Sequence, residues 1–423
     1  MTLEDHLFRR DSGRIIAAVS RLLGPQSLAV AEDVAQDAFC RALEVWPLRG
    51  IPDNPSAWLM LTAKNRALDF LRRQRTAHTF APELAAMLES EQTLAAAVDN
   101  LFSPSEMKDD LLRMMFSCAD PRLPEQTQAA LILQVLCGFA VDEVANAFMS
   151  GHHAMEKRLV RAKKVLATSE ALFDVSSEPD LEDRLPVQRA LYQLFNEGYH
   201  GGSPKAAVRE ELCHEAVRLT AILAADVRCA TPSTYALGAL MCLHAARLSG
   251  RTTANADELV PFGSQERRLW DRVLIREGLQ LLELAAEGPD LTSYHLEAMI
   301  AAVHCSASNS GETDWTAIVE LYDQLLAVAP SPVVALSRAV AIGQRDGPES
   351  GLAELRKIAN EDKLVRYPFY FAALGEFESV LGQLEAASAS FDHALSLARS
   401  PMERQFYKRR LDGLERRESA AWA

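Results

Sequence analysis

Long apolar runs are absent from this 423-residue sequence. No segment approaches the roughly 20 consecutive apolar residues that a membrane-spanning helix needs, so we expect no membrane association. The first six residues already include two acids, and no continuous apolar segment follows them, which argues against a signal peptide. From these absences we expect a cytoplasmic protein.

Paired cysteines and the common catalytic motifs are absent as well. The seven cysteines form no Cys-x-x-Cys pair, so we expect free thiols in a reducing compartment. There is no glycine-rich phosphate loop ending in Lys-Ser/Thr, no Gly-x-Ser-x-Gly elbow and no His-Glu-x-x-His motif, so nucleotide-loop, hydrolase and zinc-protease chemistry lack support. We therefore predict no enzymatic activity, no catalytic residue, no metal site and no cofactor.

One group of polar residues keeps a metal-dependent alternative open. Glu197 and His200 stand at i and i+3, with His214 downstream, and could bind a metal ion if the fold brought them together. A glycine-terminated helix with polar end residues explains the pattern more simply, so a helical metalloenzyme is the weaker alternative. Three further histidines lie on apolar helical stretches: His244, His295 and His304. We expect histidines at such positions to be packed and hydrogen-bonded.

The net charge of −14 argues against a protein that coats nucleic acid indiscriminately, but the charge is unevenly distributed. Residues 1–170 have a net charge of −3, and the remaining residues have −11. Residues 64–75 and residues 155–164 each contain five basic residues and one acid. Two such clusters on an acidic chain favour local contacts with a polyanion, although solvated helix faces give the same pattern.

The periodicity of apolar residues is helical almost throughout, which predicts an all-α protein. Breaks rich in Gly, Pro and Ser divide the chain, and a polar joint is expected at 174–179. We predict a helical domain at 1–75, a linker at 76–105, a second helical domain at 106–170, a helical extension at 180–290 and helical repeats at 291–415.

The segment 55–75 is the most informative part of the sequence. It begins with proline, contains no internal Gly or Pro and is expected to form one helix. Helical spacing places an apolar set on a face that can pack: Met60, Ala63, Ala67 and Phe70. The same spacing places a polar set on another face: Thr62, Asn65, Arg66, Asp69 and Arg73. Amide and guanidinium groups on one face suit phosphate binding and contact with unstacked bases.

Residues 142–164 have the pattern of a helix-turn-helix. A short helix at 142–148 is followed by a break at Ser150-Gly151 and by a longer basic helix. In the longer helix, one apolar set is expected to face a core: Met155, Leu159, Ala162 and Leu166. Other side chains then point away, where the major groove of DNA could receive them: His153, Lys157, Val160, Arg161 and Lys164.

The order of three motifs resembles the extracytoplasmic-function (ECF) sigma factors of the sigma-70 family. The motifs are AEDVAQDAFCRALEVW at 31–46, the helix at 55–75 and the unit at 142–166. The resemblance implies a non-enzymatic protein that brings core RNA polymerase to promoter DNA. It implies a fold with a promoter-melting domain, a helix-turn-helix domain and a C-terminal helical extension that modulates activity.

The same resemblance implies roles for individual residues. The segment 31–46 would dock on the polymerase with its apolar stripe (Leu28, Ala31, Val34, Ala38, Ala42) turned inward and four polar residues turned outward: Glu32, Asp33, Asp37 and Arg41. The minus-ten promoter element would be recognised and melted by Asn65, Arg66, Asp69, Arg72 and Arg73. The minus-thirty-five element would be contacted by His152, His153, Lys157, Arg158 and Arg161. Many sigma factors have Gly, Thr and Lys at the positions of Met149, Ala154 and Glu156.

The remainder of the chain resembles the long C-terminal extension of one ECF group, which ends in TPR-like helices. The resemblance includes LYQLFNEGYHGG at 191–202, WDRVLIREGL at 270–279 and SPVVALSRAVA at 331–341. Small and aromatic residues at 374–395 match the places where a tetratricopeptide hairpin packs closely. Because TPR grooves can bind peptides, a peptide or protein ligand is a candidate partner of this extension.

Two further alternatives remain open. A helix-turn-helix transcription regulator with a TPR-like sensor would bind DNA without engaging the polymerase. A scaffold protein that binds only peptides would leave both basic helices unexplained.

Overall fold

The computed structural model describes residues 3–76, 104–148, 150–169, 173, 181–199, 208–252, 260–359, 364–398 and 401–421. Within these ranges the chain forms α-helices and short 3-10 helices and no β-strand, which confirms the predicted all-α fold. Most of the predicted linker at 76–105 and the whole polar joint at 174–179 lie outside the described residues. None of the helices in these ranges has the length and apolar character needed to cross a membrane.

The chain divides into two compact units. The first comprises residues 1–194 and 225–229, and the second comprises residues 195–224 and 230–423. The division falls within α10 (Leu181–Tyr199), so that this helix contributes residues to both units. The finer division into five segments stays a prediction.

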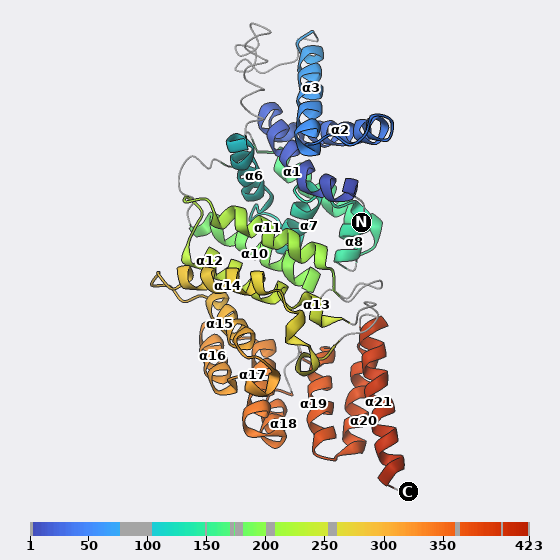
Figure 1. Cartoon of the computed structure of the whole chain (residues 1–423), viewed down its shortest axis with the longest axis vertical. Helices are drawn as coiled ribbons and strands as arrows, with labels where there is room; N and C mark the ends of the chain where they lie inside the picture. The colour runs from blue at the N-terminus through green and yellow to red at the C-terminus, as the bar shows by residue number, and fades with distance from the viewer. Residues whose placement is uncertain are drawn as a thin grey trace. The chain divides into compact units, whose positions relative to one another are not determined.

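The first unit is organised around α1 (Leu3–Leu23). This helix packs against α2 (Leu28–Arg49), α3 (Pro55–Thr76) and α6 (Pro104–Cys118), and α2 packs against α3 (Figure 1). A 3-10 turn at Pro25–Ser27 joins α1 to α2. The remaining helices of this unit that precede α10 pack against one another: α7 (Glu125–Val135), α8 (Val141–Ala147) and α9 (His152–Ala167).

A buried carboxylate ties α6 to α1. The side chain of Asp110 is fully buried and accepts hydrogen bonds from Arg21 on α1 at 3.1 Å and from Arg113 on α6 at 2.8 Å. Burial raises the pKa of Asp110, and the two guanidiniums act against this shift. An unpaired carboxyl group at this position would be costly, and the two arginines reduce this cost by supplying hydrogen bonds and opposite charge.

The second unit consists of helices that pack mainly on their neighbours in sequence. The helix α12 (Pro232–Ala245) contacts α11 (Glu210–Ala224), α14 (Arg272–Ala285) and α15 (Ser293–Ser306). Short elements lie between α12 and α16: α13 (Leu248–Arg251), η2 (Phe262–Ser264), η3 (Arg267–Leu269) and η4 (Ser310–Glu312). Successive helices then pack side by side to the end of the chain (Figure 1): α16 (Trp315–Val328), α17 (Pro332–Asp346), α18 (Pro348–Lys357), α19 (Pro368–Val380), α20 (Leu384–Ser396) and α21 (Pro401–Ala421).

Side-chain caps fix where several of these helices begin. The carboxylate of Asp271 accepts a hydrogen bond from the backbone N–H of Val273 at 2.8 Å, at the start of α14. The carboxylate of Asp314 accepts one from Ala317 at 3.0 Å, at the start of α16. Each cap satisfies a backbone donor that has no partner within its helix, which typically stabilises the helix by about 1 kcal/mol.

The helix pair within 374–395 is present as α19 and α20. The turn between the two helices contains Gly382 with φ of +75°, a conformation that favours glycine. Gly375 of α19 faces the ring of Phe391, and a Cβ at this position would lie 3.0 Å from three ring atoms. Ala387 and Ala394 are fully buried beside Phe391. The likeness of this pair to a tetratricopeptide unit stays a prediction.

A second close approach joins α17, α18 and α19. A Cβ on Gly343 of α17 would lie 2.2 Å from the end of the Phe377 ring of α19, and a Cβ on Gly351 of α18 would lie 2.6 Å from the same ring. Phe377 belongs to a buried cluster with Leu336, Leu352 and Leu355, so its ring has little room to move. The two glycines therefore create the space that Phe377 fills.

We predict that Gly343→Ala lowers the free energy of unfolding by about 1–3 kcal/mol, because the added methyl group overpacks a filled site. The measurement is urea denaturation followed by far-ultraviolet circular dichroism. Gly413→Ala in α21 is the matched control, since nothing lies within 4 Å of its added Cβ. This control should be neutral or slightly stabilising. Equal stability of the two variants would contradict the packing argument.

Candidate nucleic-acid interface

The apolar stripe predicted on α2 is buried in the structure. All five predicted residues lie inside the first unit, together with three more: Leu28, Ala31, Val34, Ala35, Ala38, Phe39, Ala42 and Trp46. The side chains of Asp33, Asp37 and Arg41 are exposed on the other side of this helix, and Glu32 is half-buried at its edge. The sequence pattern therefore placed the polar candidates of α2 on the correct face.

The packing face of α3 is shifted slightly from the predicted one. Leu59, Ala63, Ala67 and Leu71 form the buried line, with Leu68 beside it. Met60 and Phe70, which were predicted to pack, are half-buried at the border of this line because each is one position away from its centre. The predicted polar face is solvent-accessible: Thr62 is half-buried, and Asn65, Arg66, Asp69, Arg72 and Arg73 are exposed.

The candidate residues of α2 and α3 meet in one groove. The guanidinium of Arg66 on α3 forms an ion pair with the Asp37 carboxylate on α2 at 2.7 Å, and each side chain is 48% exposed. A shallow cavity of about 410 Å³ surrounds this pair and is lined by Asp37, Arg41, Thr62, Asn65, Arg66 and Asp69, among others. Two of the residues predicted to dock on the polymerase, Asp37 and Arg41, therefore share a surface with three of those predicted to recognise the minus-ten element: Asn65, Arg66 and Asp69. The cavity does not include Glu32, Asp33, Arg72 and Arg73.

Exposed apolar side chains near this groove were missed by the sequence analysis. Leu48 at the end of α2 is 85% exposed, and Ile51 and Leu61 are also exposed. The Trp46 and Trp58 rings pack edge to face nearby, with centroids 5.5 Å apart. The period of the α2 stripe could have revealed Leu48, because that position falls off the buried face. Exposed apolar groups beside a polar helix face are suited to contacts with a protein surface or with unstacked bases.

The helix α9 buries the predicted stripe and exposes the predicted polar side chains. Met155, Leu159, Ala162 and Leu166 are buried. His152, His153, Lys157 and Arg161 are exposed, whereas Arg158 is half-buried. Before α9, the carboxylate of Glu143 accepts a hydrogen bond from the backbone N–H of Ala140 at 2.9 Å and so caps α8. Met149 lies outside the described residues.

Two of the candidate histidines have acidic partners within this unit. The Nδ1 atom of His152 contacts the carboxylate of Asp142 on α8, and that of His153 lies 3.1 Å from the carboxylate of Glu156. Glu156 stands where many sigma factors have lysine, so this position adds a negative charge to the exposed face of α9. Lys157 and Arg161 are the cations on this face best placed to contact a phosphate backbone.

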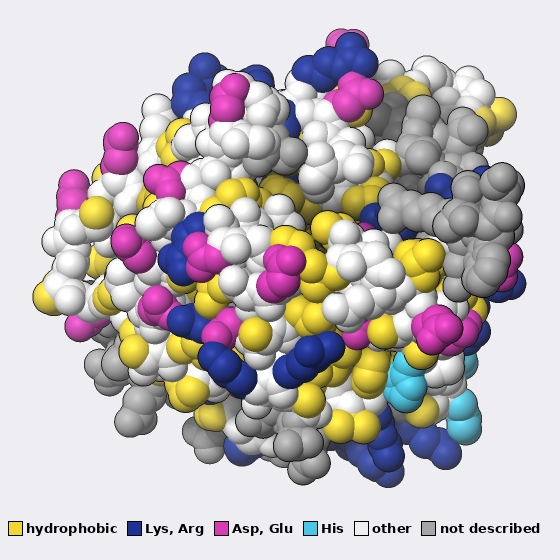
Figure 2. Space-filling view, turned by 90° about the horizontal axis from the view of Figure 1, so that it is seen from below, with side chains coloured by type: hydrophobic (Ala, Val, Ile, Leu, Met, Phe, Trp, Pro, Cys, Tyr) yellow, Lys and Arg dark blue, Asp and Glu magenta, His cyan; other side chains and the backbone are white. Residues whose placement is uncertain are grey.

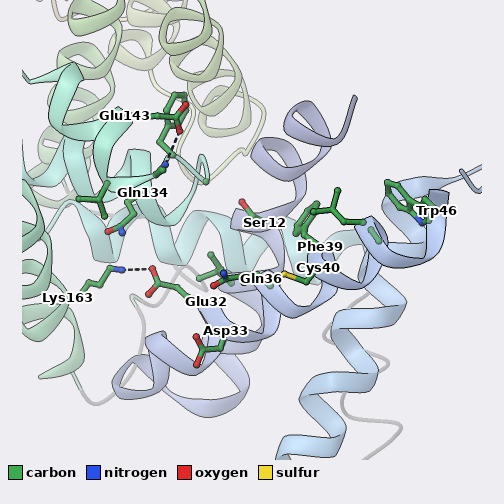
Figure 3. Close-up of a pocket in the computed structure, with 18 residues that line it drawn as sticks. Ser12, Glu32, Asp33, Gln36, Phe39, Cys40, Trp46, Gln134, Glu143 and Lys163 are labelled. Carbon is green, nitrogen blue, oxygen red and sulfur yellow. Dashed lines mark hydrogen bonds and ion pairs between the residues drawn. The ribbon is translucent and has the colours of Figure 1, made fainter. Parts of the chain in front are cut away.

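A cavity of about 880 Å³ lies between α1 and α2 on one side and α7, α8 and α9 on the other (Figure 3). At one end of it, Lys163 of α9 and Glu32 of α2 form an ion pair at 2.5 Å. Both side chains are less than a third exposed. This ion pair links the helix assigned to DNA reading with the helix assigned to polymerase docking.

Charges of both signs are mixed on one face of the molecule (Figure 2). On the face shown in Figure 2, lysine and arginine side chains alternate with aspartate and glutamate side chains, and hydrophobic side chains are exposed between them. The chain has a net charge of −14, but on this face its acidic and basic side chains are not separated into distinct areas.

The metal-dependent alternative finds no support in the part of the chain that the structure describes. No group of three or more His, Cys, Asp or Glu side chains in that part is arranged to hold a metal ion. His200, one of the three residues considered for such a site, lies outside the described residues. Glu197 is half-buried on α10, and His214 is exposed on α11.

Comparison with known proteins adds independent information on this first unit. Residues 7–77, which cover most of α1 and all of α2 and α3, match the family model Sigma-70 region 2. Residues 184–286 match a family of unknown function (DUF6596). The chain is therefore a sigma-70 family protein in which region 2 is followed by a DUF6596 segment. An uncharacterized protein of Rhizobium meliloti (strain 1021) is 36% identical over 392 residues, which are 92% of this chain and 91% of that protein.

We predict that Lys163→Glu lowers the free energy of unfolding of the full chain by about 1 kcal/mol, because it places two acids together at a half-buried contact. Lys164→Glu, at the exposed neighbouring position, should have little effect. Combining Lys163→Glu with Glu32→Lys should restore most of the loss, since the ion pair is rebuilt with reversed polarity. Urea denaturation of the unaltered chain, Lys163→Glu, Glu32→Lys, the double variant and Lys164→Glu tests this, and additive single effects in the double variant would contradict it.

Proposed function

We propose that this protein is an RNA polymerase sigma factor of the ECF type, which directs the core enzyme to specific promoters and initiates transcription there. The observation that carries the proposal is the exposed polar face of α3, with Asn65, Arg66 and Arg73, inside the segment that matches Sigma-70 region 2. Neither the family match nor the surface requires a covalent reaction, so the proposed mechanism is differential binding.

In this proposal α2 docks on the core polymerase. Its buried alanine stripe fixes the helix on α1 and α3, so that Asp33, Asp37 and Arg41 are presented on a rigid support. The exposed Leu43 and Leu48 would add apolar contact area at the same surface. A rigid helix that presents both charges and apolar groups loses little conformational entropy on binding.

The face of α3 then stabilises the melted minus-ten element. Guanidiniums of Arg66 and Arg73 can clamp phosphates, and the amide of Asn65 can hydrogen-bond to base edges that strand separation exposes. Arg66 would exchange its ion pair with Asp37 for one with a phosphate. Both partners are half-exposed, so this exchange costs roughly 1 kcal/mol or less. Stabilisation of the open strand over the duplex is what drives melting in this proposal.

The upstream duplex would be read by α9. Lys157 and Arg161 are exposed on the face opposite the buried stripe and can reach phosphates or base edges in a major groove. His152 and His153 lie in the first turn of α9, where the helix dipole and the backbone N–H groups favour a phosphate. The acidic partners Asp142 and Glu156 reduce this attraction. We therefore expect α9 to position the protein on the upstream duplex more than to increase its affinity for DNA.

The fourth part of the proposal concerns the C-terminal helical extension, which would modulate activity. It contains most of the negative charge of the chain and the DUF6596 match. A peptide or protein ligand of its TPR-like helices remains a proposal that only a binding experiment can test.

The central test is a run-off transcription assay with core RNA polymerase and promoter templates. We predict that Arg66→Ala combined with Arg73→Ala reduces promoter-specific transcription at least tenfold while leaving polymerase binding intact, because two phosphate contacts are lost. The salt dependence of promoter binding should also become shallower by about two units of slope. Arg189→Ala, which removes an equally exposed arginine of the first unit, is the matched control. Full activity of the double variant would refute the role of α3.

A second prediction separates docking from DNA recognition. Asp33→Lys should weaken the association with core polymerase at least tenfold without unfolding the protein, because Asp33 is exposed on the outer face of α2. Asp37 is less suited to this test, since its reversal would also free Arg66. Glu125→Lys on α7 makes the same charge change on another exposed surface, where it also breaks an ion pair with Arg189, and it should leave the association with core polymerase unchanged. A regulator that does not engage the polymerase would show no pull-down of the core enzyme even with the unaltered chain.

A further inference from the structure

A cavity of about 430 Å³ lies within the second unit, far in sequence from the sigma-70 segment. A second cavity of about 730 Å³ adjoins it and shares part of its wall, including Tyr199, Arg251 and Phe262. Aromatic side chains from five different elements line the smaller cavity, among them Tyr199, Phe262, His304, Trp315, Tyr322 and Phe369. A concave space of this size, lined by aromatic groups with a few polar atoms, is typical of a small-molecule site.

Two guanidiniums at this site have no anionic partner among the described residues. Arg247 is only 8% exposed, and its Nε atom is buried without a hydrogen-bond partner. The Nη1 atom of Arg251 is also buried without a hydrogen-bond partner. Both groups rest on aromatic rings: Cζ of Arg247 lies 4.3 Å from the centre of the Phe262 ring, and Cζ of Arg251 lies 3.7 Å from the centre of the Tyr199 ring.

The electrostatic surroundings of Arg247 confirm that its charge is poorly compensated. Burial lowers the pKa of Arg247, and the nearby charge of Arg251 lowers it further. The groups that act in the opposite direction are tyrosine and cysteine side chains, which are neutral at pH 7. A buried cation without an anion or a full set of hydrogen bonds is unfavourable, so an arrangement of this kind is retained only where something else supplies the missing partner.

Other arginines of the same unit show what a structural role looks like. The guanidinium of Arg267 donates hydrogen bonds to the backbone oxygens of His304 and Ala307 and to the hydroxyl of Thr313, and so ties η3 to the end of α15. Arg338 pairs with the carboxylates of Asp323 and Glu354. Glu403 also lines both cavities and is itself engaged in an interaction. Arg247 and Arg251 differ from Arg267 and Arg338, because each has a buried nitrogen without a hydrogen-bond partner and lies against an aromatic ring.

A neutral histidine completes the polar lining. The ring of His304 packs between Phe262 and Trp315, with centroid distances of 4.6 and 5.4 Å. Burial and the charges of Arg247 and Arg267 lower the pKa of His304 to about 3, so the ring is uncharged at pH 7. Its Nδ1 atom is buried without a hydrogen-bond partner. This atom can donate to or accept from a bound molecule, depending on the tautomer.

We infer that this cavity binds a small molecule that combines an anionic group with a planar aromatic body. The anionic group, a carboxylate or a phosphate, would be held by Arg247 and Arg251, which supply the charge and the donors that the cavity leaves unpaired. The aromatic body would pack among Tyr199, Phe262 and Trp315. The ligand would bind apart from the surface of α2 and α3, so the site adds a binding activity that the sigma-factor function does not require.

The test uses two fluorescent probes that differ only by one sulfonate group and therefore in charge. Anilinonaphthalene sulfonate carries an anionic group on an aromatic body, and N-phenyl-1-naphthylamine is the same body without the sulfonate. We expect the full-length chain to bind the anionic probe at one saturable site at least tenfold more tightly than the neutral one, because only the sulfonate can pair with the two arginines. Competition with 1-naphthoate and 1-naphthyl phosphate then distinguishes a carboxylate ligand from a phosphate ligand.

Three variants attribute binding to the cavity. Arg251→Met should weaken binding of the anionic probe about tenfold and leave the neutral probe unaffected, whereas Arg251→Lys should retain most of the affinity because it keeps the charge. Arg268→Met, which removes an arginine that is 80% exposed, should bind like the unaltered chain. Because Arg251 is only half-buried, these variants should keep the thermal unfolding of the parent, which circular dichroism verifies. Equal affinity for the two probes, or unchanged binding by Arg251→Met, would overturn the inference.

Discussion

Close packing of small residues sets the geometry of the first unit. Alanines form half of the buried line of α2, and Ala63 and Ala67 are fully buried on α3. Small side chains let helix axes approach closely, and they also leave little freedom for one helix to rotate on another. The polar faces of α2 and α3 are therefore fixed relative to each other. The groove that holds Asp37 and Arg66 follows directly from this packing.

Two ion pairs of the first unit differ in the free energy needed to replace one of their members with an external partner. The Arg66–Asp37 pair is half-exposed, so exchange of Asp37 for a phosphate oxygen is nearly balanced. The Lys163–Glu32 pair is more buried, and separation of its charges leaves each partly desolvated. Contacts with the exposed face of α3 can therefore form without a change in the packing of the first unit. A partner that uses Glu32 must compete with Lys163, so in the proposed function docking through α2 would be coupled to the position of α9.

Helix faces could be predicted from the sequence because they depend on local periodicity. The buried stripes of α2 and α9 agree residue by residue with the positions expected from a 3.6-residue repeat. On α3, Met60 and Phe70 were misplaced because large apolar residues border a line whose centre is made of alanine and leucine. Histidine packing was also foreseen in part: His295 is buried and its Nε2 lies 3.2 Å from the backbone oxygen of Ala285. Lys163 and Glu32 are 131 residues apart, and no local pattern relates them.

The cavity of the second unit shows why sites of this kind escape a reading of the sequence. Its polar atoms come from α13, from the segment before it and from the end of α15, and none of these stretches contains a recognisable motif. What identifies the site is a difference between arginines that look alike in the sequence. Arg267 donates a hydrogen bond to a backbone oxygen at the end of a helix, where the carbonyl groups lack partners within the helix. This interaction explains why its guanidinium is buried. Arg247 and Arg251 lie against aromatic rings, which attract a cation but do not neutralise it. A cation–π contact offsets part of the desolvation of a guanidinium and leaves its hydrogen-bond donors unused, so the two arginines remain able to bind an anion.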